Sequence, residues 1–167
     1  MSFEIERKWF LKELPEMCKT KAPCDIEQCY IASSPSVRIR KSLEHRDPYK
    51  ITFKGPGNIK RVEIEENISE ETYNKLKTFM VNPKGIISKK FWKFNILGTD
   101  LNYEISTVDG MWHYIEVEFK SEEEANNFKP PEWFGTDVTE SISIKGYSDL
   151  KIKIGKPFNL PEVMFGK

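Results

Sequence analysis

Charged and apolar side chains alternate along many short segments of this chain, and this pattern restricts the fold more than any other feature of the sequence. Successive side chains of a β-strand point to opposite faces of the sheet. In residues 3–10, Glu4, Glu6 and Lys8 therefore share one face, and apolar side chains occupy the other, where Arg7 intrudes. Such alternation predicts antiparallel strands with one charged and one apolar face.

Similar segments recur along the chain, separated by turn residues and by two helical segments. Ser69 is the predicted N-cap of one helix, and Ser121 with Glu124 forms a predicted capping box for the other. The tail beyond residue 140 is ambiguous, because LKIKI alternates like a strand while a helical turn near Tyr147 also fits. Strands are predicted at about 3–10, 26–32, 37–42, 49–54, 59–68, 87–94, 101–108 and 113–120. The fold class predicted from these elements is α+β and mainly β.

The charged faces differ from the wet side of an ordinary sheet, although that remains the simpler interpretation of any single strand. They consist almost entirely of Glu, Arg and Lys, and the positive and negative charges are grouped on different segments. Basic pairs lie in 37–42 and 49–54, and acidic pairs lie in 3–10, 59–68 and 113–120. If eight strands close, these charges converge on a water-filled lumen and the apolar faces point outward. We therefore predict a closed eight-stranded antiparallel β-barrel with a charged lumen, covered outside by the helices and the tail.

Such a lumen has the chemistry of a site for an anion and a cation together. Converging Arg and Lys side chains repel one another unless an anion lies between them, and Arg binds phosphate oxygens through two parallel hydrogen bonds. Glutamates without His or Cys favour a hard cation, which indicates Mg²⁺ or Mn²⁺ rather than zinc. A polyphosphate with a divalent metal satisfies both sets of charges.

Composition narrows the class of protein further. The 167 residues suit one domain, 1–167, and 38 % of them are hydrophobic. The formal net charge is zero, so nothing in the overall balance favours nucleic acid or an anionic membrane. Three cysteines form no CxxC pair, which favours a reducing compartment. With no apolar signal segment and no membrane-spanning stretch, the expected location is cytoplasmic.

The ordered motifs resemble those of the CYTH family, also called the triphosphate tunnel metalloenzymes. They comprise Glu4-Ile-Glu6-Arg-Lys8, Gln28-Cys-Tyr30, VRIR with Arg38 and Arg40, ITFKG with Lys54, RVEIEENI with Arg61, Glu63 and Glu65, and IEVEF with Glu116 and Glu118. The stretch PPEWFGTDVT followed by Tyr147 is similar to the family's C-terminal part. The resemblance covers nearly the whole chain and implies a tunnel of eight antiparallel strands.

The resemblance also implies a function, which is a divalent-metal-dependent triphosphatase. Its expected substrates are inorganic triphosphate, a nucleoside triphosphate such as ATP, thiamine triphosphate, or the 5′-triphosphate end of an RNA, and the expected assembly is a monomer or a homodimer. The residues expected to bind and act on the triphosphate are Lys8, Arg38, Arg40, Lys54, Arg61 and Lys89. The residues expected near Mg²⁺ or Mn²⁺ are Glu4, Glu6, Glu63, Glu65, Glu104, Glu116 and Glu118. For each glutamate alone, a structural ion pair is as good an explanation as metal ligation.

Three positions depart from the family's pattern. Phe91 stands where a second basic residue is common after Lys89, Ser106 where an acidic residue is common, and Gly146 where a basic residue is common. Two alternatives to the triphosphatase remain open. One is a class IV-like adenylyl cyclase on the same scaffold, and the other is a non-catalytic sensor of triphosphorylated ligands, which the three departures favour.

Overall fold

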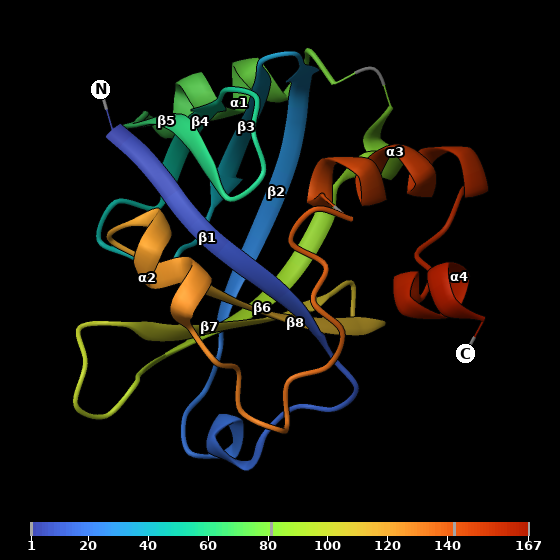
Figure 1. Ribbon diagram of the computed structural model, residues 1–167. Helices are drawn as coiled ribbons and strands as arrows, with labels where there is room; N and C mark the ends of the chain where they lie inside the picture. Colours follow the sequence, from blue (N-terminus) through green and yellow to red (C-terminus); the bar gives the residue numbers. More distant parts are fainter. Residues whose placement is uncertain (1, 81, 142, 167) are drawn as a thin grey trace.

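A computed structural model of the protein describes residues 2–80, 82–141 and 143–166, and its central feature is a closed antiparallel barrel (Figure 1). The strands are β1 (Ser2–Leu11), β2 (Cys24–Ser33), β3 (Ser36–Lys41), β4 (Tyr49–Lys54), β5 (Lys60–Asn67), β6 (Ile87–Asn95), β7 (Asn102–Val108) and β8 (Trp112–Glu118). Around the barrel they follow the order β1-β5-β4-β3-β2-β6-β7-β8, and β8 pairs with β1 to close it. The predicted fold class and closure are confirmed.

Helices and two short 3₁₀ turns connect or follow the strands. They are η1 (Glu16–Lys19), α1 (Glu70–Lys77), η2 (Pro83–Gly85), α2 (Glu122–Asn127), α3 (Ile144–Ile154) and α4 (Leu160–Phe165). Ser69 caps α1 by accepting a hydrogen bond from the Thr72 amide. Ser121 caps α2 in the same way, but the Glu124 carboxylate accepts from the Lys120 amide, so the predicted capping box is displaced by one residue.

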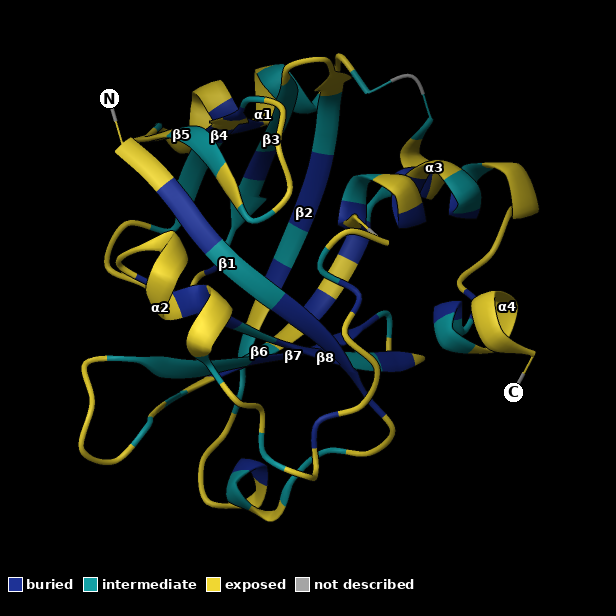
Figure 2. Cartoon of the chain, viewed as in Figure 1, coloured by how far each residue is buried: buried dark blue, intermediate teal, exposed yellow. Residues whose placement is uncertain are grey.

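The barrel is apolar outside, as predicted, and the helices and the tail cover most of that surface (Figure 2). Trp9, Ile115 and Val117 pack with Ala125 of α2, whereas Ile39 packs with Tyr73 of α1. The outward face of β1, β4 and β5 is less well covered, since Phe3, Phe53 and Ile64 remain exposed. Arg7, the charged intruder on the outer face, donates hydrogen bonds to the Ala125 and Phe128 carbonyls at the end of α2. The apolar side chains of the strands thus lie on the outside of the barrel, and the charged side chains face the lumen.

The ambiguous tail forms helix α3, and a buried polar network fixes it against the barrel. The Lys151 ammonium and the Tyr147 hydroxyl each donate to one carboxylate oxygen of Asp109, at 2.8 Å. Asp109 lies in the turn after β7, with φ 50°. Ser148 donates to the Gly85 carbonyl at 2.6 Å. This network holds the first residues of α3 beside one end of the barrel. None of the helices in the described part of the chain has the length and apolar character needed to cross a membrane.

Candidate active site

The barrel encloses one large cavity of about 1070 Å³, to which all eight strands contribute side chains. The β3–β4 turn and the first residues of α3 also line it. Every residue that the sequence predicted to bind phosphate or metal lines this cavity, and they are Glu4, Glu6, Lys8, Arg38, Arg40, Lys54, Arg61, Glu63, Glu65, Lys89, Glu104, Glu116 and Glu118. The structure therefore brings the whole predicted set together in one tunnel.

Strand order places opposite charges across the tunnel from each other. In a closed ring of eight strands, each strand faces the one four places away, so β3 faces β8. Arg38 and Arg40 on β3 consequently oppose Glu116 and Glu118 on β8. We call the side of the tunnel that carries Arg38 and Arg40 the basic wall, and the side that carries Glu116 and Glu118 the acidic wall. A ligand between the two walls would contact both.

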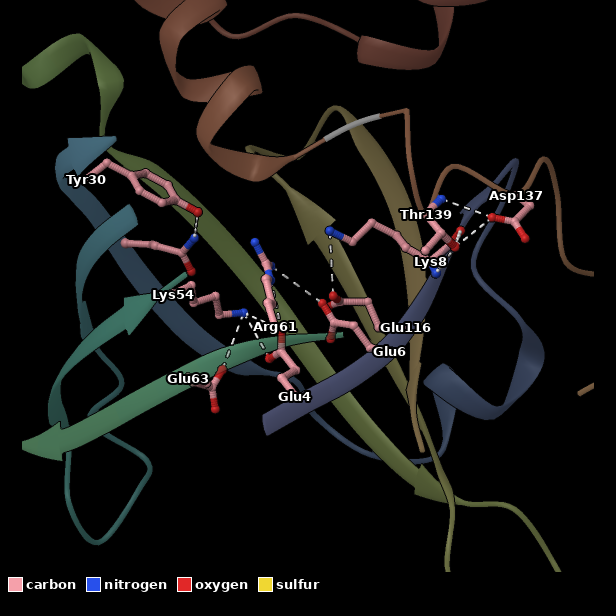
Figure 3. Close-up of polar contacts among 11 residues, drawn as sticks. Glu4, Glu6, Lys8, Tyr30, Lys54, Arg61, Glu63, Glu116, Asp137 and Thr139 are labelled. Atoms are coloured by element: carbon pink, nitrogen blue, oxygen red, sulfur yellow. Dashed lines mark hydrogen bonds and ion pairs between the residues drawn. The ribbon is translucent and has the colours of Figure 1, made fainter. Parts of the chain in front are cut away.

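The carboxylate of Glu4 is neutralised within the tunnel (Figure 3). The Lys54 ammonium donates to both Glu4 oxygens at 2.9 Å and lies 3.5 Å from Glu63, and Arg61 approaches Glu4 at 3.5 Å. Burial raises the pKa of Glu4, but the charge of Lys54 and hydrogen bonds from Glu63 and Lys54 outweigh it and lower the pKa to about 2. Two predicted phosphate ligands, Lys54 and Arg61, are thus engaged with a predicted metal ligand.

A second pair of carboxyl groups, Glu6 and Glu116, lies beside Lys8 (Figure 3). Burial, together with the charges of Glu116 and Glu4, raises the pKa of Glu6 well above its usual value. Burial also works to raise the pKa of Glu116, but the Lys8 ammonium, 3.6 Å away, and a hydrogen bond with Glu6 lower it to about 2. The pKa values of these two neighbouring carboxyl groups are therefore moved in opposite directions, because the Lys8 ammonium favours the ionised form of Glu116 and the charge of Glu116 disfavours that of Glu6.

Three further glutamates of the tunnel have raised pKa values. Burial and the charge of Glu116 raise the pKa of Glu104 to about 7, and burial with the charge of Glu4 raises the pKa of Glu118. Burial and a hydrogen bond to Glu4 raise the pKa of Glu63 to about 7. Clustered carboxyl groups that raise one another's pKa are the donor set that a hard divalent cation suits.

The carboxylates are nevertheless not already arranged as a metal site. Within residues 2–80, 82–141 and 143–166, no three acidic, His or Cys side chains converge as metal ligands would. The contacts explain this, since Lys54 holds Glu4, Lys8 lies 3.6 Å from Glu116, and Glu65 accepts a hydrogen bond from Thr52 at 3.1 Å. Loading a cation would require these partners to be exchanged.

The basic wall, by contrast, has no internal counter-charge. Within the described residues, Arg38, Arg40 and Lys89 have no carboxylate within 4.0 Å of their charged groups. Burial and the charge of Arg38 lower the pKa of Arg40, and the same two causes lower the pKa of Lys89 well below its usual value. Clustered cationic side chains that lower one another's pKa in this way form a binding site for an anion.

Sequence analysis did not include Tyr114 among the site residues, although it lines the cavity. Tyr114 is buried in the lumen wall, with the ammonium groups of Lys8 and Lys89 each 5.3 Å from its ring centroid. Its place two residues before Glu116 was a usable signal, since the alternation puts both on one face. Tyr30, from the motif Gln28-Cys-Tyr30, also lines the cavity, and its hydroxyl accepts a hydrogen bond from the fully buried Gln28 at 2.8 Å. In the β2–β3 register Gln28 lies beside Arg40 and Tyr30 beside Arg38.

The structure also shows what surrounds the three departures. Phe91 faces the lumen between Lys89 and Lys93, which both line it, so no shift of register is needed to bring in a second lysine on β6. Lys90 points outward and pairs with Asp25 at 2.9 Å. Beside the departure at Gly146, Lys145 lines the cavity at the start of α3.

Comparison with known proteins supports the sequence motifs. No model of a protein family matches the chain. The chain is 28 % identical over 146 residues to the inorganic triphosphatase of Nitrosomonas europaea, covering 85 % of this chain and 93 % of that protein.

Solved structures support the fold. A crystal structure of an inorganic triphosphatase matches with a TM-score of 0.59 at 24 % identity, over 89 % of this chain and 95 % of that chain. A conserved hypothetical protein from Pyrococcus furiosus matches with a TM-score of 0.56 at 24 % identity, over 74 % and 83 % of the two chains. A putative adenylate cyclase from Bacillus halodurans matches with a TM-score of 0.51 at 16 % identity, over 86 % and 100 %. The relationship to an inorganic triphosphatase over most of the chain, together with this shared fold and the tunnel that it encloses, confirms the resemblance to the CYTH, or triphosphate tunnel metalloenzyme, family.

Proposed function

We propose that this protein is a divalent-metal-dependent triphosphatase that hydrolyses inorganic triphosphate or a related small triphosphate inside the barrel. One observation carries the proposal: among the residues that the structure describes, no carboxylate lies within 4.0 Å of the charged groups of Arg38, Arg40 and Lys89, and these three share a cavity with a facing wall of glutamates. An anion with several charges, bound with a cation, neutralises both walls at once. The similarity to an inorganic triphosphatase supports the same conclusion.

The basic residues divide into two groups in this proposal. Arg38, Arg40 and Lys89 are free to receive phosphate oxygens and to stabilise charge on the transferred phosphoryl group. Lys54 and Arg61, which contact Glu4 at 2.9 Å and 3.5 Å, reach phosphate by leaving this carboxylate. Lys8 completes the set. Binding is thus coupled to an exchange of ion-pair partners within the tunnel.

The glutamates fit a hard cation by the chemistry of their donors, because they are all carboxylates, and burial and the charges of neighbouring glutamates raise the pKa values of Glu6 and Glu104. The residues that would hold Mg²⁺ or Mn²⁺ are Glu4, Glu6, Glu104, Glu116 and Glu118, while Glu63 and Glu65 would hold a second ion or orient the arginines. A bound cation neutralises phosphate charge and makes water a better nucleophile. Glu6, whose pKa is raised, would have to be ionised to hold the cation, because metal ligation needs the carboxylate form.

Several further properties belong to the same proposal. Cys18, Cys24 and Cys29 are all unpaired, which suits a reducing, cytoplasmic location. Residues 1–167 act as one domain, as a monomer or a homodimer. ATP and thiamine triphosphate are the organic substrates to test first.

One assay panel tests the proposed function. The purified protein is incubated with Mg²⁺ or Mn²⁺ and with inorganic triphosphate, ATP or thiamine triphosphate, and released phosphate and cyclic AMP are measured separately. Phosphate release that stops in EDTA is the expected result. Cyclic AMP from ATP would instead identify a cyclase, and tight triphosphate binding without turnover would identify a sensor.

A further inference from the structure

One edge of β1 is paired with β5 along only part of its length. The β1–β5 register ends at Ile5 opposite Lys60, whereas β8 continues along the other edge to the end of the strand. Beyond this point residues 134–139, which connect α2 to α3, lie along the edge of β1 that β5 leaves, with an antiparallel bridge between Trp9 and Asp137. We call residues 134–139 the strap.

The strap contacts β1 through backbone hydrogen bonds that require a glycine. The Phe10 amide donates to the Thr136 carbonyl at 2.9 Å, and the Gly135 amide donates to the Phe10 carbonyl at 2.8 Å. A Cβ atom at position 135 would lie only 2.5 Å from the Phe10 carbonyl oxygen, so a side chain would push the strap away from the strand. The glycine thus permits a close backbone contact at this point.

Lys8 makes both of its backbone hydrogen bonds along this edge with the strap. The Val138 amide donates to the Lys8 carbonyl at 2.8 Å, and the Lys8 amide donates to the Thr139 hydroxyl oxygen at 3.0 Å (Figure 3). The Lys8 side chain lies in the tunnel, where its ammonium is 3.6 Å from Glu116. The position of the backbone at Lys8 determines where this ammonium reaches, so the strap helps to set its place in the lumen.

Asp137 fixes the direction of the Thr139 hydroxyl. Thr139 Oγ1 lies 2.7 Å from Asp137 Oδ1 but 3.4 Å from the Lys8 carbonyl oxygen, so its single proton goes to the carboxylate. The lone pairs of the same oxygen are then left to accept the hydrogen bond from the Lys8 amide. The other carboxylate oxygen of Asp137 accepts from Arg7 at 2.9 Å, on the outer face of the barrel. A continuous chain of contacts therefore runs from Arg7 outside the barrel to Lys8 in the lumen.

From these contacts we infer that Thr139 and Asp137 are positioning residues, which hold Lys8 where its ammonium reaches the triphosphate. The inference rests on the proposed function, in which Lys8 binds and acts on that ligand, and it assigns a task to two residues outside the charged set of the tunnel. A displacement of roughly 1 Å can lower a reaction rate about 100-fold, so the loss of one contact to β1 at this point has a measurable effect.

Thr139→Val tests the inference, because it keeps the shape of the side chain but removes the oxygen that accepts from Lys8. With Mg²⁺ and inorganic triphosphate it should lower kcat about tenfold and change KM by less than about twofold, because the other basic residues still hold the triphosphate. Thr139→Ser keeps the hydroxyl and should restore kcat. Asp137→Ala, at a half-exposed carboxylate, should lower kcat about threefold, and it provides a second variant should Thr139→Val fail to fold.

Thr107→Val is the matched control. Thr107 is hydrogen-bonded to His113 Nδ1 at 2.8 Å on the outer face of β7, so its replacement removes a similar hydrogen bond from the barrel without touching Lys8. Urea unfolding measures the stability of each variant. Thr107→Val should lose stability to a similar extent as Thr139→Val, but its kcat should stay within about twofold of the wild type.

Two further measurements distinguish positioning of Lys8 from a general loss of stability. In the metal-free protein, hydrogen exchange at the Lys8 amide should become faster in Thr139→Val than in Thr107→Val. In a Lys8→Met background, Thr139→Val should lower kcat by less than about twofold more, because the residue through which it acts is gone. Single-turnover assays with excess enzyme measure these slow variants.

Three results would overturn the inference while the proposed function stands. They are an unchanged kcat in every folded variant at positions 137 and 139, unchanged exchange at the Lys8 amide in Thr139→Val, and a further tenfold loss of kcat when Thr139→Val is added to Lys8→Met. A wild-type protein that releases no phosphate from inorganic triphosphate would overturn the proposed function, and this inference with it.

Discussion

The Lys54 ammonium donates hydrogen bonds to both carboxylate oxygens of Glu4, at 2.9 Å each, although the two residues are 50 positions apart in the chain. Both side chains retain only 9 % of their accessible surface. The pair joins the group of phosphate ligands to the group of metal ligands. In the ligand-free protein each neutralises the other, and in the proposed complex each takes a new partner.

The first prediction concerns the stability of this buried pair. Removing one partner leaves a buried charge with less compensation, so Glu4→Gln and Lys54→Met should each lower the free energy of unfolding by about 3 kcal/mol. The double variant should lose less than the sum of the two, because no charge is stranded. Urea unfolding in EDTA measures these values, and strictly additive losses would show that the pair is not coupled.

The second prediction concerns the basic wall, where stability and binding should change in opposite directions. Arg40→Gln relieves repulsion from Arg38, so the ligand-free protein should become no less stable. Triphosphate affinity should fall about 10- to 100-fold, because charge-assisted hydrogen bonds contribute roughly 1.5–3 kcal/mol each. Thermal unfolding measures the stability, and calorimetric titration measures the triphosphate affinity.

Lys120→Gln, at an exposed ion pair with Asp100, is the matched control and should change neither quantity by much. Unchanged affinity in Arg40→Gln would remove Arg40 from the binding site.

The third prediction separates metal ligation from packing on the acidic wall. Glu6→Gln and Glu118→Gln keep side-chain size but remove the charge that a hard cation needs, so both should abolish hydrolysis and weaken Mg²⁺ binding. Glu6→Gln should leave the metal-free protein at least as stable as the wild type, since burial and the charges of Glu116 and Glu4 disfavour the ionised form of Glu6. Glu66→Gln lies exposed on the next position of β5 after the lumen residue Glu65, and it should behave like the wild type. Full activity of Glu6→Gln, or of the wild type in EDTA, would contradict the metal assignment.

The fourth prediction is a pH dependence of the metal-free protein. Glu63 and Glu104 have pKa values raised to about 7, above the usual value of 4.5. The folded protein therefore keeps protons on them that the unfolded chain has lost, and this favours folding at low pH. Their contribution to the free energy of unfolding should decline as the pH rises from about 4.5 to about 7.

Denaturant unfolding in EDTA across this pH range measures the effect, with Glu104→Gln as the informative variant. Glutamine at position 104 cannot ionise, so the slope of stability against pH should become less negative between these limits. Saturating Mg²⁺ should reduce the decline in the wild type, because the cation favours the ionised carboxylates. A slope unaltered by Glu104→Gln would mean that this carboxyl group titrates normally.

Much of the candidate site could be predicted from the sequence, because the alternation of side chains along a strand is local. In β1, β3 and β5, each charged residue of the pattern lies on the lumen face, and the neighbouring apolar residues lie outside. The same rule held for Ser106 beside Glu104. The N-caps at Ser69 and Ser121 were equally local, since a cap depends on amides within a few residues.

The structure of the C-terminal tail could not be decided from local sequence patterns. LKIKI alternates like a strand, yet it lies in α3, because Tyr147 and Lys151 are four residues apart and so share the helix face that meets Asp109. Ser143 caps the start of the helix, and Gly155, at φ 89°, ends it. The sequence pattern allowed both structures, and contact with a distant turn selected the helix.

The sequence by itself determined which side chains face inward, since that depends only on the two-residue period of a strand. The tertiary structure decided which of them meet, because barrel closure brings together residues far apart in the chain. It paired Glu4 with Lys54, placed Lys8 beside Glu116, and left Arg38, Arg40 and Lys89 without a carboxylate within 4.0 Å among the described residues. It also placed Phe91 opposite Ser106 in the β6–β7 register. Charge compensation acts over a few ångströms in space, so it depends on strand order and register rather than on spacing along the chain.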